Sequence, residues 1–385
     1  MTDTREQRFR RTLQSLIAKD SVPLKTLEEL LGSSESFNDL TSGSRLPSLY
    51  EATILSAFFK ISPGLLLQTE EPTMGVSLRL GALDGIHDVS AAVAHATQLL
   101  TIDRLTREWG FTEPITDVSN FAASKIWHDR HAGEKTAARL RAYLGLDETD
   151  PVTDLTGFVE SLGYPVEYRN LPDNVHGISI PENWGDDASW VILINCNDGW
   201  ARQRFTLSHE LSHVLQQDTG QVIVDRATTE DRRPERIADS FARHFLLPED
   251  AILSAIEDHE GIDSREGMAH LVAKLVLTYG ISRDATIIAL LDVIAEIDRN
   301  PHFEFCKNSS VSEIMRISGN LGQWEELNSS RGFHFPSERL TQQTLNAYND
   351  ELISLQSVAD VIADGDISSA VQQLSSAGWQ ISSSV

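Results

Sequence analysis

The chain has 385 residues, of which 41% are hydrophobic and 23% are charged. This length allows a sizeable core and predicts two or three domains, because domains usually hold about 100–200 residues. The amino-terminal sequence MTDTREQRFRRTL has no apolar core, so we expect no secretory signal. No apolar run reaches the roughly 18 residues of a membrane span. We therefore expect a cytoplasmic protein and exclude a membrane-spanning one.

The net charge of −25 is distributed unevenly along the sequence. Residues 1–69 carry eight basic and eight acidic side chains, so all the excess negative charge lies after residue 69. The simplest role of such acidity is solubility, and it also repels a phosphate backbone. If nucleic acid binds this protein, residues 1–69 are expected to make the contacts.

Residues 1–69 show the pattern of a small helical bundle. Apolar residues at helical spacing predict helices over residues 9–17, 24–31, 34–40 and 54–59. Gly32, which closes the second of these, suits the tight turn of a helix-turn-helix.

The order of these helices resembles the Cro-repressor (XRE) helix-turn-helix family, including its G-x-x-x-P connection at Gly43–Pro47. The resemblance implies DNA binding by residues 1–69, with the helix after Gly32 as the recognition helix. Asn38 can hydrogen-bond to adenine, and hydroxyl and guanidinium groups can contact phosphate or base edges. The candidate DNA contacts are Ser34, Ser36, Asn38 and Arg45.

The composition of the presumed recognition helix also supports an alternative. It contains Glu35 and Asp39 but no Arg or Lys. Because acidic groups are repelled by phosphate, a helical bundle that contacts proteins instead of DNA remains open for residues 1–69.

The regions around the central domain are expected to be helical. Residues 70–134 form a helical linker in this interpretation, because residues 83–127 have helical spacing with few breakers. After residue 296 the sequence turns irregular, and the region 296–385 is expected to end in a helical hairpin over residues 337–362 and a short last helix. We assign no chemistry to that region.

The segment FTLSHELSH at residues 205–213 contains the HExxH spacing of zinc peptidases. Residues four apart lie on one face of an α-helix, so His209 and His213 can bind one metal ion. Glu210 is offset by about 100° around the helix, where it can reach a metal-bound water. A zinc-acidified water that a carboxylate deprotonates is the nucleophile of a peptide hydrolase.

The surrounding sequence predicts a frame for this motif. Ser189–Asn195 is an apolar, β-branched run typical of a buried strand. Asn197–Gly199 predicts a turn, and a helix is expected to begin near Arg202. Apolar residues on that helix are spaced to bury one side, while the two histidines are expected to face outward.

A third metal ligand is expected on the helix that begins at Pro234 and ends before Pro248. Glu235 is the best candidate, because two histidines and one carboxylate with an open fourth position make a catalytic zinc site. Asp239 lies on the same helix face and is either a rival ligand or a partner of the ligands.

These motifs resemble the ImmA/IrrE metallopeptidases over roughly residues 135–295. The resemblance is carried by Arg204–His213, Glu235–Pro248, Gly163–Val166, His176–Ser179, Ile192–Asn195 and Tyr279–Ser282, in the family's order. It implies that His209, His213 and Glu235 bind Zn²⁺ and that Glu210 is the catalytic base. The sequence departs from the family at two positions, with Ser212 in place of the usual Gly and Asp239 in place of the usual Asn. Both changes are small and polar, and they leave every catalytic position filled.

The same resemblance places the short strand His176–Ile180 near the cleft. Gly177 permits close backbone approach, so this strand can pair with a substrate peptide as an added strand. His176 and Gly177 are therefore candidate substrate-binding residues, with His176 placed to contact substrate or the transition-state oxyanion. A purely structural role for His176 is the alternative.

The predicted fold class is α+β and predominantly α: a helix-turn-helix bundle, then a zincin-like metallopeptidase domain with a small sheet, then a helical carboxy-terminal tail. The predicted function is a zinc-dependent endopeptidase and regulator that cleaves a specific partner protein, by resemblance a repressor or other transcription factor. One alternative is a DNA-binding regulator whose metallopeptidase-like domain only senses a ligand or partner. Another is a toxin–antitoxin or phage-type interaction protein.

Overall fold

The computed structural model describes residues 5–19, 24–31, 34–47, 51, 55, 58–59, 77–80, 90–111, 115–122, 129–182, 189–217, 233–257, 262–294 and 296–376. The chain divides into two compact units, Met1–Thr73 with Asp88–His95, and Met74–His87 with Ala96–Val385. The described residues are mostly helical with one small sheet, so the predicted α+β, predominantly α class is confirmed. Within these ranges no helix is both long enough and apolar enough to cross a membrane.

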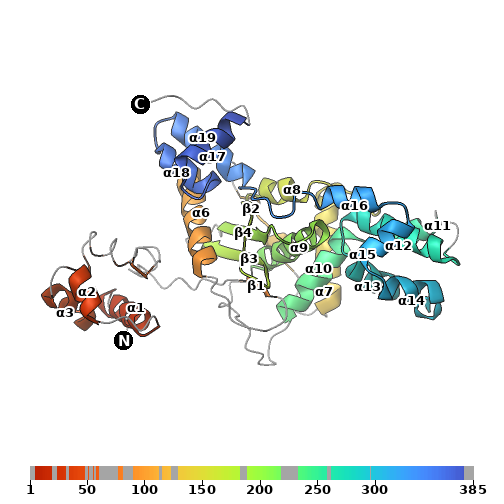
Figure 1. Ribbon diagram of the computed structural model, residues 1–385, viewed down its shortest axis with the longest axis horizontal. Helices are drawn as coiled ribbons and strands as arrows, with labels where there is room; N and C mark the ends of the chain where they lie inside the picture. Colours follow the sequence, from red (N-terminus) through yellow and green to blue (C-terminus); the bar gives the residue numbers. More distant parts are fainter. Residues whose placement is uncertain are drawn as a thin grey trace. The chain divides into compact units, whose positions relative to one another are not determined.

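The first unit is a small helical bundle (Figure 1). Its described helices are α1 (Arg5–Lys19), α2 (Leu24–Leu30) and α3 (Ser34–Ser42), close to the predicted bounds. They enclose an apolar core of Phe9, Leu13, Leu27, Phe37, Leu40, Leu55 and Phe59. Half of the predicted fourth helix, residues 54, 56 and 57, lies outside the described residues.

The second unit is built on a sheet with the strand order β1-β3-β4-β2 (Figure 1). The strands are β1 (Ser77–Leu80), β2 (Val166–Arg169), β3 (Val175–Glu182) and β4 (Ser189–Asn195). β3 runs antiparallel to both β1 and β4, whereas β2 runs parallel to β4. Every residue of β4 is buried, as its apolar run predicted.

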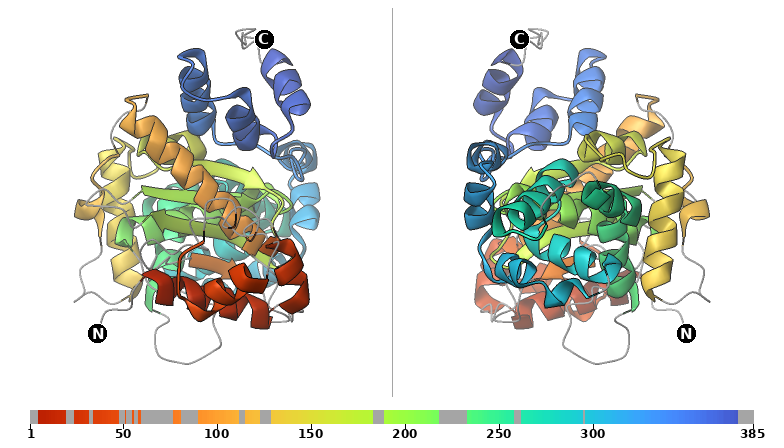
Figure 2. Two further views of the ribbon diagram at one scale, coloured as in Figure 1. Left: turned by 90° about the vertical axis from the view of Figure 1, so that its left-hand side faces the viewer. Right: turned by 90° about the vertical axis from the view of Figure 1, so that its right-hand side faces the viewer.

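Helices cover both faces of this sheet. In one view of Figure 2, α6 (Ser90–Glu108) crosses in front of the strands, and in the opposite view the helices that follow β4 lie in front. Of these, α9 (Trp200–Gln216) packs directly on β3 and β4 and against α10 (Arg233–Leu246). The core between them also takes in η1 (Ser119–Phe121), α7 (Asp129–Tyr143) and α8 (Leu155–Ser161).

A second apolar core surrounds α12 (Arg265–Tyr279). It includes α11 (Glu249–Glu257), α13 (Arg283–Val293), η2 (Ile297–Arg299), α14 (Pro301–Asn308), α15 (Val311–Ile317) and α16 (Leu321–Leu327). The prediction of irregular chain after residue 296 is wrong, because the polar residues that suggested loops are helix caps. Asn300 accepts hydrogen bonds from the first turn of α14, and Ser310 accepts one from Glu313 in α15.

The predicted carboxy-terminal hairpin and last helix are confirmed as α17 (Glu338–Asn349), α18 (Leu355–Ile362) and α19 (Ile367–Ser376). The segment before α17 attaches to the outer edge of β2. Phe335 and Tyr168 exchange backbone hydrogen bonds of 2.8 and 2.9 Å, and His334 Nε2 lies 2.7 Å from Glu167 Oε1. These contacts tie the carboxy-terminal region to the sheet.

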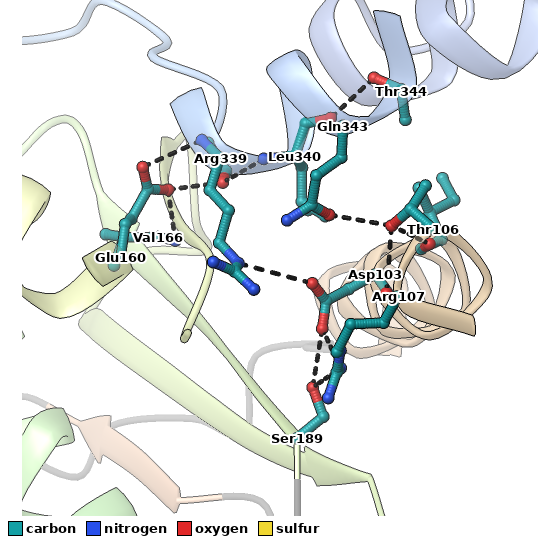
Figure 3. A network of polar contacts seen from close by, with 12 residues as sticks. Asp103, Thr106, Arg107, Glu160, Val166, Ser189, Arg339, Leu340, Gln343 and Thr344 are labelled. Atoms are coloured by element: carbon teal, nitrogen blue, oxygen red, sulfur yellow. Dashed lines mark hydrogen bonds and ion pairs between the residues drawn. The ribbon is translucent and has the colours of Figure 1, made fainter. Parts of the chain in front are cut away.

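A buried polar network joins α6, β4 and α17 (Figure 3). The Asp103 carboxylate is fully buried, pairs with Arg107 and accepts a hydrogen bond of 2.9 Å from Ser189 Oγ. Arg339 Nε lies 3.8 Å from the other Asp103 oxygen. Asp103 therefore provides the negative charge for two guanidinium groups from different parts of the chain.

We expect Asp103→Ala to lower the free energy of unfolding by about 3 kcal/mol, because it leaves Arg107 and Arg339 without their buried counter-charge. Urea denaturation measures this loss. As a matched control, Glu108→Ala on the same helix removes only the exposed pair with Arg104 and should cost about 0.5 kcal/mol or less. Equal losses in the two variants would contradict a stabilising role for the network.

Candidate active centre

The HExxH helix α9 is buried on all sides at its centre. Every residue from Thr206 to Leu215 is buried, and only 2% of His209 and of His213 is exposed. The expectation that the two histidines face outward is therefore wrong. The sheet covers one side of α9, and α10 covers the other. The periodicity of α9 left the face of the histidines uncovered, because it gives no information about a helix that is distant in the sequence.

Three side chains converge on one point between α9 and α10. His209 Nε2 lies 3.2 Å from His213 Nε2 and 3.2 Å from Glu235 Oε2, and His213 Nε2 lies 3.5 Å from Glu235 Oε1. One ligand atom from each residue lies within 4.8 Å of the others. Zinc binds such donors at about 2.0–2.1 Å with tetrahedral geometry, which separates neighbouring donors by about 3.3 Å. The arrangement of these atoms thus fits a zinc ion.

The carboxylate of Asp239 contacts the ring of His209 on the side away from the other two candidate ligands. Its Oδ1 atom lies 3.0 Å from His209 Nδ1, the ring nitrogen that faces away from His213 and Glu235. A histidine that binds a metal through one nitrogen usually donates its other N–H to a carboxylate or carbonyl. Of the two roles left open for Asp239, this contact favours the partner of a ligand.

The position of Glu235 depends on how α10 packs against α7. A Cβ atom on Gly133 of α7 would lie 2.5 Å from both Ile237 O and Phe241 N of α10. The two helices therefore approach closely at a point where no side chain fits between them. This contact fixes the first turns of α10, which carry Glu235 and Asp239.

The carboxylate environment differs between the two glutamates. Burial raises the pKa of Glu210, and the nearby charges of His213 and His209 only partly oppose this effect. Burial also acts to raise the pKa of Glu235, but the hydrogen bond and charge of His209 and the charge of His213 outweigh it, so the pKa is lowered. Glu235 thus favours the charged form that a metal ligand needs.

Glu210 contacts β3 through residues that lie two apart. Ser179 Oγ donates a hydrogen bond of 2.6 Å to Glu210 Oε2, while Glu210 Oε1 has no hydrogen-bond partner among the described residues. A Cβ atom on Gly177 would lie 3.1 Å from Oε1 and 2.5 Å from Thr206 Cγ2. Gly177 therefore lets the strand lie directly against the carboxylate.

Ser179 was not among the site residues predicted from the sequence. The available signal was its spacing, since residues two apart point to the same face of a strand. Gly177 was assigned to the cleft, and Ser179 lies on the same face. Recognising it also required knowing that this face meets Glu210, which only the packing of α9 on β3 shows.

His176, the other candidate substrate contact, is held at the beginning of α9. Its Nδ1 atom lies 2.8 Å from Asp198 Oδ2, and its Nε2 atom lies 3.3 Å from Arg202 Nη1. Both ring nitrogens are therefore occupied by charged neighbours. The structure does not bring His176 into the group formed by His209, His213 and Glu235.

The candidate DNA contacts lie in the first unit. Asn38 is exposed on α3, whereas Arg45 donates two hydrogen bonds to Glu51, of 2.8 and 2.6 Å. The side chains of Ser34 and Ser36 lie outside the described part of the structure. DNA binding by this unit stays a prediction.

Comparison with known proteins shows that the central region is similar to one protein family. Residues 161–290 match the model of the IrrE N-terminal-like domain, peptidase family M78, which covers about a third of the chain. The match includes β2, β3, β4, α9 and α10, and supports the expected metallopeptidase domain. No curated protein and no solved structure matches the chain.

We expect Gly177→Ala to destabilise the protein by about 1–3 kcal/mol, because the new methyl group overlaps Thr206 and presses on Glu210. Denaturant unfolding measures the change. Gly322→Ala is the matched control, since nothing lies within 4 Å of its Cβ position in helix α16 and the substitution should be neutral or stabilising. Equal stabilities of the two variants would show that the strand does not lie this close to the helix.

Proposed function

We propose that the domain around residues 161–290 is a zinc-dependent endopeptidase that cleaves a protein partner. The observation that carries this proposal is the convergence of His209, His213 and Glu235 beside the buried carboxylate of Glu210. Two histidines, one carboxylate and a nearby carboxylate base form the donor set of a hydrolytic zinc site. The match to a peptidase family supports the same reaction class.

Each side chain has a defined task in this mechanism. His209, His213 and Glu235 would hold zinc, which would supply a Lewis acid to acidify water and polarise the peptide carbonyl. Glu210 takes the proton from the attacking water through Oε1 and returns it to the leaving amine. Ser179 holds the other oxygen of Glu210, and Asp239 orients the His209 ring so that Nε2 faces the ligand group.

The proposed substrate is a specific protein, and the resemblance to the ImmA/IrrE metallopeptidases suggests a repressor or another transcription factor. The helical bundle of residues 1–69 is proposed to direct the enzyme toward such a target, through DNA or through protein contacts. Its exposed Asn38 supports the first route, whereas the pairing of Arg45 with Glu51 counts against Arg45 as a DNA contact.

The competing function is a sensor that binds a metal or a partner without hydrolysis. A sensor needs His209, His213 and Glu235 but gives no reason to keep Glu210. A buried carboxylate oxygen without a hydrogen bond costs free energy, so its retention favours a chemical role. We therefore place the peptidase ahead of the sensor.

The metal assignment predicts the zinc content of purified variants. The parent protein and Glu210→Gln should hold about one zinc ion per chain, whereas His213→Ala and Glu235→Ala should hold clearly less. Elemental analysis after dialysis provides the measurement. His244→Ala is the control on the same helix as Glu235. His244 Nδ1 contacts Ser240 O at 2.7 Å, so this substitution should leave the zinc content unchanged. Equal zinc in every variant would exclude this ligand set.

The peptidase assignment predicts that Glu210→Gln and His213→Ala behave alike in cells. Removing the base should slow turnover by about 10²–10⁴-fold, so the uncleaved partner should accumulate at full length in both variants. Quantitative proteomics of the variant and parent strains measures this accumulation. A sensor would instead keep its regulation in Glu210→Gln and lose it in His213→Ala, and that outcome would overturn the proposal.

A further inference from the structure

The part of the sheet that contacts the catalytic carboxylate is short. Ser179 donates its hydrogen bond to Glu210, and the Cα atom of Gly177 faces the same carboxylate. Residues 177–179 of β3 therefore lie directly beside the carboxylate that would act as the base.

Residues 177–179 of β3 pair with a different strand along each of their two edges. On one side, Gly177, Ile178 and Ser179 pair with β4. On the other side they pair with β1, in the register Ser77 with Ser179, Leu78 with Ile178 and Arg79 with Gly177. The two edges of β3 beside Glu210 are thus both covered.

The strand β1 comes from a distant part of the chain. β2, β3 and β4 all lie within residues 161–290, the region that matches the peptidase family, whereas β1 lies far before it. The sheet of that region therefore ends at β3, and β1 is an extended segment added to its edge. β1 also packs against α9, the helix that carries Glu210.

Edges of this kind bind extended peptides. An extended segment added to an exposed strand gains main-chain hydrogen bonds that depend little on its sequence. Because neighbouring strands lie about 4.8 Å apart, the main chain at Arg79 lies one strand spacing from Gly177 and so close to Glu210. The backbone of β1 therefore lies where an extended substrate would bind.

We propose that β1 is the chain's own occupant of the edge of β3 from Gly177 to Ser179, the edge at which the main chain of the protein substrate is expected to pair. A substrate must displace β1 before it can be cleaved, so the protein is self-inhibited. This inference rests on the proposed peptidase activity, and it identifies the substrate as an extended, unfolded segment.

The test removes the hydrogen bonds of β1 and measures binding without hydrolysis. Successive residues of a strand point their N–H groups to opposite edges, so Pro at both Leu78 and Arg79 removes the N–H that faces β3 whatever the register. The substitutions are made in full-length protein that also carries Glu210→Gln, so that a bound peptide is not cleaved. The conservative control is Leu78→Ile with Arg79→Lys, which keeps both N–H groups.

The probe is a fluorescently labelled peptide with the sequence of residues 74–84, MGVSLRLGALD, measured by fluorescence anisotropy. A tethered strand competes at an effective concentration on the order of millimolar, so the double Pro protein should bind the probe at least about 10-fold more tightly than the control protein. Hydrogen exchange should become faster at those N–H groups of residues 177–179 that face β1 and remain unchanged in the middle of β4. Equal affinities, or unchanged exchange at residues 177–179, would overturn the proposal.

Folding and function are separated by two further readings. The double Pro protein should keep its helical circular dichroism and its zinc, and a loss of either would show that β1 is an integral strand and overturn the proposal. Binding and exchange need no peptide-bond cleavage, so they do not depend on the outcome for Glu210→Gln in cells. If that cell experiment succeeds and the affinities here are equal, the peptidase stands and only the self-inhibition fails.

Discussion

The close contact of β3 with α9 is the constraint on which the candidate centre depends. Gly177 leaves no room for a side chain between the strand and Thr206, and two residues later Ser179 meets the Glu210 carboxylate. This contact buries a carboxyl group that would otherwise be solvated. The hydrogen bond from Ser179 offsets part of the desolvation cost and fixes Oε2 of Glu210. The other oxygen, Oε1, has no hydrogen bond among the described residues and is left to act as the base.

The ligand group needs a second close contact, between α7 and α10. Glu235 and Asp239 approach the histidines on α10, which packs on α9 and lies against α7 at Gly133. α9 ends at Gln216, and α10 begins at Arg233. Packing between helices, and not local chain geometry, therefore brings the carboxylates to the histidines.

The outer parts of the second unit are joined to its sheet by charge and by strand pairing. Asp103 connects α6 to β4 through Ser189 and faces Arg339 of α17 (Figure 3). Glu160 of α8 is buried and accepts hydrogen bonds from Ser337 Oγ, Val166 N and Arg339 N. The same region closes the edge of β2 through Phe335. The carboxy-terminal helices thus brace the sheet that supports α9, although they contribute no side chain to the ligand group.

The sequence by itself determined the local elements and the identity of the reactive side chains. The apolar run of β4, the HExxH helix, the helix of Glu235 and the carboxy-terminal hairpin follow from periodicity and capping, which involve residues only a few positions apart. The short helices α14 to α16 were missed, because their caps have the same polar composition as loops.

Only the tertiary structure decided what surrounds those side chains. The burial of His209 and His213, the contact of Ser179 with Glu210 and the pairing of β1 with β3 each join residues from separate elements. Periodicity shows which face of an element is apolar but not which element will cover it. That choice is made when the whole chain packs, because the free energy of burial depends on contacts between segments that are far apart in sequence.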